Sequence, residues 1–593
     1  MRKLLFIFVL FIAVVANAQE LDYSEYGAPK IEITPYSSNI NLGDNYYMVI
    51  PKINLKGAST TPPELLIYQI QNNGSLDLKY VKSYPVNGNS QFARFNFTVA
   101  DDGRATEYVW QGHSGYVIIK DGLCGTSDTV TAGDLGYDQI RPHLQYLVAD
   151  DNILITLTQN LGSPDTTIVF TGQNALPYVI GSDTITDQTT MRYEYIVVHD
   201  LNSGQNLLEI PLWNFLRPSD LDPTHFTSGG VVSTLPGAHA NSIGFFDDSL
   251  GYVFGYPHWV FAVSAKELHQ IWFVSEDGSE ILRAENNNQG DFIFKSDMYS
   301  PAKFQSLQLS DQHGLVIEPD GYDLNSGVLD MLLYNNGKSQ GFAEGLVLQF
   351  DFKQNPTRSY SKAWVGLHPD TLASNRLGNI QYMPIANQSF FLVNWGGQSK
   401  NSQNFSIMDP AGNPVVDYDF ADQYDEAFKI TVLEESHPFI QQLLSQLPTV
   451  THDNNVLEVD EVATEYFWGN GDTTISSSIS APTDTSMWTA GTRNSCGGLF
   501  INSYTETVGV ETSTNNDIAV FYPNPSQQGQ DIYLSESVNG GVVEITDIAG
   551  KLLVQKPVTS QTISMDHLTP GMYIISVISN GGIVALKQRQ VIY

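Results

Sequence analysis

Histidines near the starts of apolar segments are the residues of this chain best suited to chemistry. His143, His239 and His313 each stand at or just before such a segment, and His368 lies in the run Leu367-His-Pro-Asp370. A neutral imidazole is a good nucleophile near pH 7 and can hold a transferred group between two half-reactions. If these segments are strands of repeated units, their polar residues can converge on one site.

The elements that must position these histidines are β-strands. Short alternating runs rich in Val, Ile, Tyr and Phe are separated by Asp-Gly, Asn-Gly and Asn-Ser-Gly turns, a pattern typical of strands and hairpins. Helical periodicity is nearly absent, and residues 438–447 are the best helix candidate. The fold class predicted is all-β.

Two hairpin units alternate along the chain. One is a strand, a polar turn with Gly and another strand; the other carries His or Asn near the start of an apolar strand. Copies of the first occupy 195–204, 271–278 and 405–412, and copies of the second occupy 143–152, 239–248, 311–316 and 378–383. Each blade of a β-propeller is two successive hairpins, so this alternation favours a propeller. The innermost strand of each blade lines the central channel, where the repeated polar residues would meet.

The stretch from about residue 30 to 430 resembles bacterial arylsulfate sulfotransferases, the kind that use no nucleotide sulfate donor. The matching segments follow the family's order and are 207–214, 220–223, 239–243, 290–294, 311–314, 334–337, 367–370, 377–381 and 393–396. The resemblance implies a six-bladed β-propeller with an N-terminal β-strand region. It also implies transfer of a sulfuryl group from an aryl sulfate donor to a phenolic acceptor through a sulfohistidine, with no metal and no cofactor.

The resemblance also supplies a set of catalytic candidates. His239 in His-Ala-Asn-Ser-Ile and His313 in Gln-His-Gly match the family's two motif histidines. His368 matches a third, and the sulfated residue is either His368 or His313. Asn241 matches the motif asparagine and is expected to orient one of the histidines.

Several positions depart from the family's pattern. No Arg follows Asn335-Asn-Gly337, and Lys338 is the cation that could replace it, as a point charge without the bidentate fork. Asn335 and Gly314 each stand where the family has Asp. These changes keep an alternative open, namely an inactive propeller that binds an aromatic or polysaccharide ligand at the cell surface.

The N-terminus and the composition indicate export. Residues 1–18 have a basic start, an apolar run and an Ala16-Asn-Ala18 site, which define a secretory signal peptide. The net charge of -35 argues against nucleic acid as a partner. No later stretch is long and apolar enough for a transmembrane span. The two cysteines, Cys124 and Cys496, are expected to lie unpaired in different domains.

The C-terminal third resembles modules of secreted bacterial proteins. Residues 464–474 and 494–497 resemble an Ig-like segment, while 521–525, 543–551 and 568–573 resemble the type IX secretion C-terminal sorting domain. The sorting domain implies the type IX secretion machinery as a partner and a location outside the outer membrane, either released or surface-held. The domains predicted are 1–18 signal peptide, 19–130 N-terminal β region and start of the propeller, 131–450 propeller, 451–510 Ig-like β-sandwich and 518–593 sorting-domain β-sandwich.

Overall fold

The protein is described by a computed structural model that covers most of residues 19–592. Besides 1–18, the segments of five or more residues outside the described residues are 55–61, 85–94, 163–177, 217–233, 287–291, 297–308, 354–358, 398–403, 481–486, 506–520, 523–531, 535–541 and 579–583, with shorter segments between them. The chain divides into two compact units, each described by itself. The larger comprises residues 1–451, 457–479 and 489–502, and the smaller contains 503–593. The predicted signal peptide lies outside the described residues.

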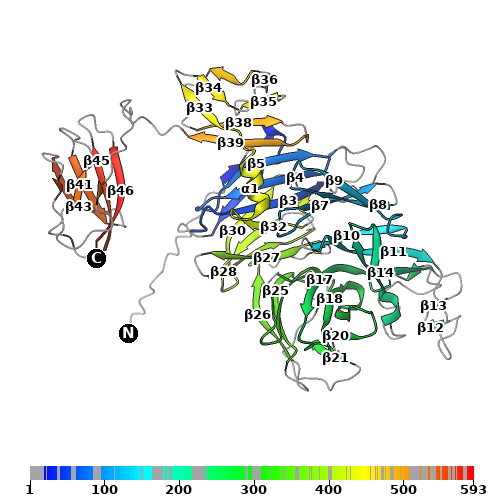
Figure 1. The fold of residues 1–593 in the computed structure, drawn as a ribbon. Helices are drawn as coiled ribbons and strands as arrows, with labels where there is room; N and C mark the ends of the chain where they lie inside the picture. The colour runs from blue at the N-terminus through cyan, green and yellow to red at the C-terminus, as the bar shows by residue number, and fades with distance from the viewer. Residues whose placement is uncertain are drawn as a thin grey trace, which may run out of the picture. The chain divides into compact units, whose positions relative to one another are not determined.

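Six sheets follow one another through the larger unit among the described residues, and their pairings are antiparallel except for β16 against β14 (Figure 1). We number them in chain order by the strands that begin them. The first contains β3 (Tyr46–Asn54), β4 (Glu64–Ile70) and β5 (Leu76–Ser83), and the second contains β6 (Phe95–Val99), β7 (Ala105–Gln111), β8 (Ser114–Lys120) and β9 (Ser127–Thr131). The third contains β10 (Gln139–Val148), β11 (Ile153–Gly162), β14 (Thr190–Asp200) and β15 (Gln205–Pro211), with β16 (Thr234–Leu235) beside β14.

The remaining three sheets repeat this plan. The fourth contains β17 (Ala240–Asp248), β18 (His258–Ala265), β19 (Gln270–Ser275), β20 (Ile281–Asn286) and β21 (Phe292–Ser296). The fifth contains β22 (His313–Val316), β24 (Val328–Asn335), β25 (Glu344–Asp351) and β26 (Ser359–Leu367), with β23 (Tyr322–Asp323) beside β24. The sixth contains β27 (Asn379–Ile385), β28 (Gln388–Asn394), β29 (Phe405–Met408) and β30 (Pro414–Phe420). The prediction of an all-β chain is confirmed.

The two ends of this series are joined by distant strands. β2 (Ile31–Pro35) pairs with β30, and β1 (Gln19–Leu21) pairs with β2, so the sixth sheet ends with N-terminal strands. Conversely, β31 (Asp425–Ala427) and β32 (Thr431–Glu434) pair with β3 of the first sheet. Segments from opposite ends of residues 19–434 therefore share two sheets.

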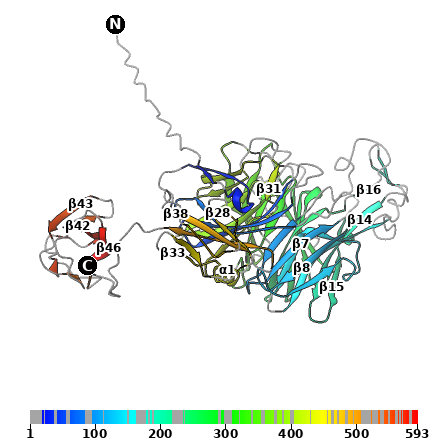
Figure 2. The same cartoon turned by 90° about the horizontal axis from the view of Figure 1, so that it is seen from above.

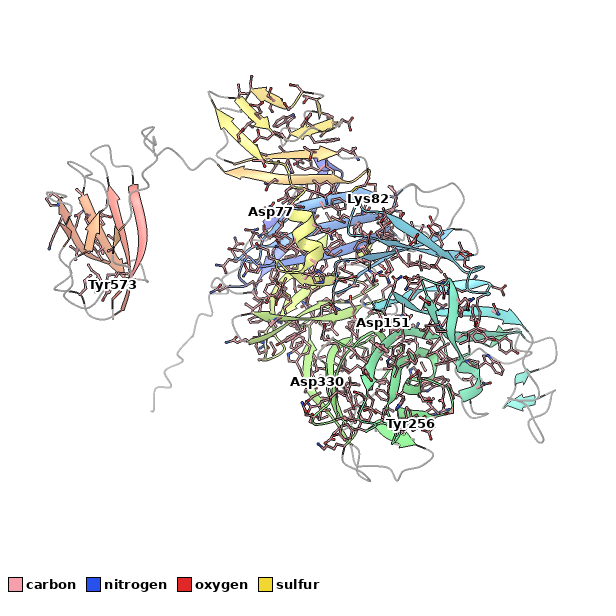
Figure 3. All side chains as sticks on the ribbon, in the orientation of Figure 1. Asp77, Lys82, Asp151, Tyr256, Asp330 and Tyr573 are labelled. Atoms are coloured by element: carbon pink, nitrogen blue, oxygen red, sulfur yellow. A yellow bond between two sulfur atoms is a disulfide. The ribbon has the colours of Figure 1, made fainter. Side chains whose placement is uncertain are left out.

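Apolar clusters lie between consecutive sheets and fill the space that Figure 3 shows occupied by side chains. Separate clusters join the first sheet to the second, second to third, third to fourth, fourth to fifth, fifth to sixth and sixth to first. Figure 2 shows β7 and β8 beside the strands of the third sheet, the pair that shares one such cluster. A sheet packed on both faces needs continuous apolar strands, and β19 is buried at all six positions.

The first strands of the sheets also contact one another. β6 contacts β3 and β10, β10 contacts β17, β17 contacts β22, β22 contacts β27, and β27 contacts β32. Because β32 pairs with β3, the series of contacts returns to the first sheet.

The single α-helix among the described residues, α1 (Pro438–Leu444), confirms the predicted helix. His437 accepts a hydrogen bond from the backbone N–H of Phe439, and Pro438 occupies the first turn, where a missing N–H does no harm. Phe439, Ile440 and Leu443 pack into the cluster between the first two sheets, and Figure 1 shows the yellow helix against the blue strands.

Strands from the predicted Ig-like segment continue the first sheet. β39 (Leu499–Thr505) pairs with β5, and it is followed outward by β38 (Met487–Arg493), β35 (Glu465–Trp468) and β36 (Thr473–Thr474). β33 (Val450–Asp453), β34 (Val456–Val459) and β37 (Ser478–Ser480) form a small separate sheet.

The prediction of two unpaired cysteines in different domains is wrong. Cys124 and Cys496 form a disulfide, with Cα atoms 5.4 Å apart and a sequence separation of 372. The pairing of β39 with β5 places the C-terminal segment against the N-terminal sheets, and sequence distance gave no sign of it.

The sorting-domain segment forms two sheets of its own. One contains β40 (Phe521–Tyr522), β41 (Ile532–Leu534) and β44 (Thr562–Ile563); the other contains β43 (Leu552–Pro557), β42 (Val542–Asp547), β45 (Gly571–Ile578) and β46 (Val584–Ile592). A two-stranded hairpin of β12 (Tyr178–Ile180) and β13 (Asp183–Ile185) completes the strands.

Candidate functional site

The starts of β17 and β22 bring three of the predicted residues together. His239 precedes β17, Asn241 lies in it, and His313 begins β22. The Asn241 side-chain amide donates to the backbone carbonyl of Gln312 at 2.7 Å, which fastens the two strands beside His313. An electrostatic contribution from His239 lowers the pKa of His313, after the larger effects of burial and Lys266. Asn241 thus holds the backbone of Gln312 and, through that backbone, helps to orient the neighbouring His313.

A buried ion pair from the third sheet fixes the start of β17. The Glu194 carboxylate accepts from the backbone N–H of Ala240 at 3.2 Å, and Arg141 lies 4.0 Å from that carboxylate. Burial raises the pKa of Glu194 to about 6. His239 itself has φ of 47°, a left-handed conformation uncommon for residues other than glycine. Neighbouring sheets therefore hold His239 in a defined place.

The hydrogen bonds of the His313 ring define its tautomer. Nδ1 lies 2.8 Å from the Asp311 carbonyl and 2.5 Å from Oδ1 of Asn336. The Asn336 orientation is set by its Nδ2, which donates to Ser374 Oγ at 2.8 Å and to the Leu377 carbonyl at 3.2 Å. Two oxygen acceptors face Nδ1, so Nδ1 carries the proton and Nε2 carries the lone pair.

Burial keeps this imidazole neutral. Burial first, and then the positive charge of Lys266, lower the pKa of His313 to about 3. Lys266 follows β18 in the short 3-10 helix η6 (Lys266–Leu268), and its Nζ lies 3.6 Å from Oδ1 of Asp311. A neutral imidazole with a lone pair on Nε2 can accept a proton or attack an electrophile.

Sequence reasoning missed two residues of this cluster. Asn336 belongs to the Asn335-Asn-Gly337 motif, so the sequence did mark this segment. The motif did not show, however, which of the two asparagines bonds to His313. Lys266 belongs to no repeat or motif, and only the packing of η6 against the loop before β22 reveals it.

His368 lies in a different cluster, after the last strand of the fifth sheet. Its Nε2 donates to Asp417 at 2.9 Å, and its Nδ1 accepts from the backbone N–H of Asp370 at 3.2 Å. Tyr36 also donates to Asp417, at 2.6 Å, and the Trp395 ring packs edge-on against His368. These contacts occupy both ring nitrogens and tie His368 to the sixth sheet. The structure brings His239, Asn241 and His313 together and groups His368 with other residues.

Local packing accounts for the two departures from the family's aspartates. Gly314 has φ of 56°, and a Cβ there would lie 2.4 Å from the Gly378 carbonyl oxygen, so a side chain cannot fit. The Asn335 amide accepts from the Ser310 N–H at 2.8 Å and donates to Glu344 at 2.9 Å, which an aspartate could not do.

The other predicted residues are less fully described. Lys338 lies outside the described residues, as does the side chain of His143, whose backbone belongs to β10. Within the described part of the chain, no group of three His, Cys, Asp or Glu side chains is arranged to hold a metal ion.

A family comparison identifies the C-terminal domain. Residues 520–592 match the secretion system C-terminal sorting domain, which confirms the predicted type IX secretion signal. The protein is therefore secreted or held at the cell surface, and its sorting domain implies interaction with the secretion machinery. None of the helices in the described segments is long and apolar enough to cross a membrane.

Comparison with solved structures gives similarities at low sequence identity. PorZ, a surface component of the type IX secretion system of Porphyromonas gingivalis, is 12% identical over 92% of this chain and 81% of its own, with a TM-score of 0.16. The extracellular domain of a putative one-component system from B. thetaiotaomicron is 11% identical over 94% and 99%, with a TM-score of 0.16. The Dos1 propeller is 11% identical over 74% and 85%, with a TM-score of 0.24. No curated protein matches the sequence.

Proposed function

We propose that the larger unit is a six-bladed β-propeller exported to the cell surface. Six sheets, an apolar cluster between each consecutive pair, and a further cluster between the sixth and first support this reading. β2 on the sixth sheet and β32 on the first would close the ring by strand exchange between its ends. The first strands of the blades, including β17 and β22, would then line the axis.

We propose further that the cluster around His313 transfers a sulfuryl group from an aryl sulfate to a phenol. The fixed tautomer of His313 carries this proposal, because it leaves the lone pair on Nε2 at neutral pH. His239 and Lys266 are the neighbours suited to hold the negative sulfuryl oxygens. The contacts of His368 favour His313 as the nucleophile, since Nε2 of His368 donates to Asp417 and the lone pair on its Nδ1 is engaged by the Asp370 N–H.

The proposed reaction has two half-reactions. Nε2 of His313 attacks the sulfur, the bond from sulfur to the aryl oxygen breaks, and the phenolate leaves with the electron pair and takes a proton from water. The acceptor phenol then loses its proton to water, its oxygen attacks the same sulfur, and the nitrogen–sulfur bond breaks. His313 returns to its starting state, so neither a metal nor a nucleotide is consumed.

A second candidate is a propeller that binds a ligand at this cluster without chemistry. The observation in its favour is burial, because His313 is only 5% exposed and a nucleophile must be reached by its donor. The ligand would be an aromatic molecule or a polysaccharide segment.

One experiment separates the two candidates. The mature protein is incubated with 4-methylumbelliferyl sulfate, with and without phenol, while fluorescence and intact mass are followed. Transfer predicts release of the fluorophore and one added sulfuryl group, both lost in His313→Asn. The matched control is His437→Asn, because asparagine also caps helices well and His437 lies at α1. Absence of both turnover and added mass in the unchanged protein would refute transfer.

A further inference from the structure

A cavity of about 430 Å³ lies in the larger unit, apart from the His313 cluster. It is bounded by the ends of β6 and β22, by β27 and β32, and by the residues just before α1. The end of β22 lines it at Val316, and Glu318 lines it just after that strand, five residues beyond His313, which is up to about 16 Å along an extended chain. The cavity is large enough for a small organic ligand.

The residues that line this cavity include one lysine, Lys429, and no arginine. Within the described part of the chain it has no hydrogen bond and no ion pair, and Glu318 is the charged group that acts on it. Burial lowers the pKa of Lys429, and Glu318 partly offsets that effect. An ammonium held in a cavity without a partner favours a bound anion.

Gln381 supplies a second polar group without a partner among the described residues. Its side chain lines the cavity, the residue is only 7% exposed, and its amide makes no hydrogen bond there. Two residues earlier on β27, Asn379 accepts from the Ile430 N–H at 3.0 Å and donates to the Ile430 carbonyl at 2.8 Å. Since residues two apart on a strand share a face, Asn379 holds the chain next to Lys429 while Gln381 faces the cavity.

The charges and walls of the cavity narrow the ligand class. Three carboxylates, from Asp101, Glu318 and Glu434, line it along with the single ammonium, so it favours a ligand that also carries positive charge. The net charge of -35 disfavours a polyanion. The apolar part of the wall can accept an aliphatic group, and consists of Val99, Ala100, Val316, Ile317, Val432 and Leu433.

We propose that this cavity binds an apolar amino acid or dipeptide as a zwitterion. Lys429 and the Gln381 amide hold the ligand carboxylate, Glu318 and Asp101 hold its ammonium group, and the aliphatic wall receives its side chain. Lys429 and Glu318 both line the cavity and carry opposite charges, so a ligand with a carboxylate and an ammonium group can contact both.

The test is calorimetric titration of the mature protein with L-alanyl-L-leucine. Its N-acetyl derivative lacks the ammonium, and its C-terminal amide lacks the carboxylate. We expect binding of the dipeptide and at least tenfold weaker binding of both derivatives, because each loses a charge-assisted contact. Lys429→Met and Gln381→Leu should also weaken binding, the first by at least tenfold. The control Lys353→Met removes an exposed lysine elsewhere and should leave binding unchanged.

The derivatives keep the test decisive even if a variant does not fold. No binding of the dipeptide by the unchanged protein at millimolar concentration would overturn the proposal. Equal binding of the N-acetyl derivative would overturn it too, because it would show that a carboxylate alone is recognised. The sulfuryl-transfer assay uses another site, so either proposal can fail without the other.

Discussion

The neutral state of His313 has a measurable consequence for stability. In the folded protein the pKa of His313 is about 3 because of burial and Lys266, while in the unfolded chain it is near 6.5. The unfolded state therefore binds more protons between these two values. Stability from this residue is fully present above pH 6.5 and is lost as the pH falls toward 3.

The size of the effect follows from the two pKa values. At pH 5, protonation of this histidine stabilises the unfolded chain by about 2 kcal/mol relative to the folded protein, and at pH 7 this stabilisation is close to zero. His313→Gln removes the titration. The variant is expected to have a lower free energy of unfolding at pH 7, because Asn336 loses its hydrogen bond to His313. Between pH 7 and pH 5, however, the free energy of unfolding of the variant should fall by about 2 kcal/mol less than that of the unchanged protein.

Urea unfolding followed by tryptophan fluorescence measures this difference. All 8 tryptophans lie before residue 489, so the sorting domain does not contribute to the signal. Subtracting the free energy of unfolding of the variant from that of the unchanged protein at each pH removes the contribution of every other titrating group that the two share. A difference that stays constant between pH 7 and pH 5 would refute the assignment of His313 as a buried neutral imidazole.

Three further predictions concern other parts of the larger unit. Cys124→Ser should lower the free energy of unfolding by about 3–5 kcal/mol, because the disulfide closes a very long loop. Dithiothreitol should mimic this effect in the unchanged protein and do nothing to the variant; an equal effect on both would contradict the bond. Asp419→Asn should raise the melting temperature much more at pH 8 than at pH 5, because burial and Glu32 directly opposite raise the pKa of Asp419 to about 7. Stability is lost as the pH rises from the unfolded-chain value near 3.9 to about 7, and most of that loss lies above pH 5. Equal shifts at both pH values would exclude this repulsion. His368→Asn should lower the free energy of unfolding by about 1.5–3 kcal/mol, because it removes a hydrogen bond that the buried Asp417 carboxylate accepts; an unchanged free energy on urea unfolding would argue against that hydrogen bond.

The sequence predicted local structure well because local structure depends on nearby residues. Alternating apolar runs and Gly-containing turns were sufficient for the all-β class. The repeated position of His239 and His313 led to the prediction that they meet, and the structure places them at the starts of β17 and β22, two strands in contact. The helix at α1 followed from its short periodic run. These features depend on patterns within about ten residues.

What the sequence did not reveal depends on contacts between distant segments. His368 matched a motif as well as His313 did, yet its position after the outermost strand of the fifth sheet places it beside Asp417. Lys266 approaches His313 only because two sheets pack together. A motif match fixes the type of residue, whereas the strand on which the residue lies decides what it can contact.

The pairing of β2 with β30 and of β32 with β3 is the clearest example of such non-local structure. In the motif around Asn379, the asparagine bonds to both backbone groups of Ile430 and so holds β32, the strand that joins the sixth sheet to the first. The same strand lines the cavity that contains Lys429. A residue from a segment that resembled the sulfotransferase family therefore holds the chain just before β32, and in doing so it fixes one wall of a cavity that the resemblance did not predict.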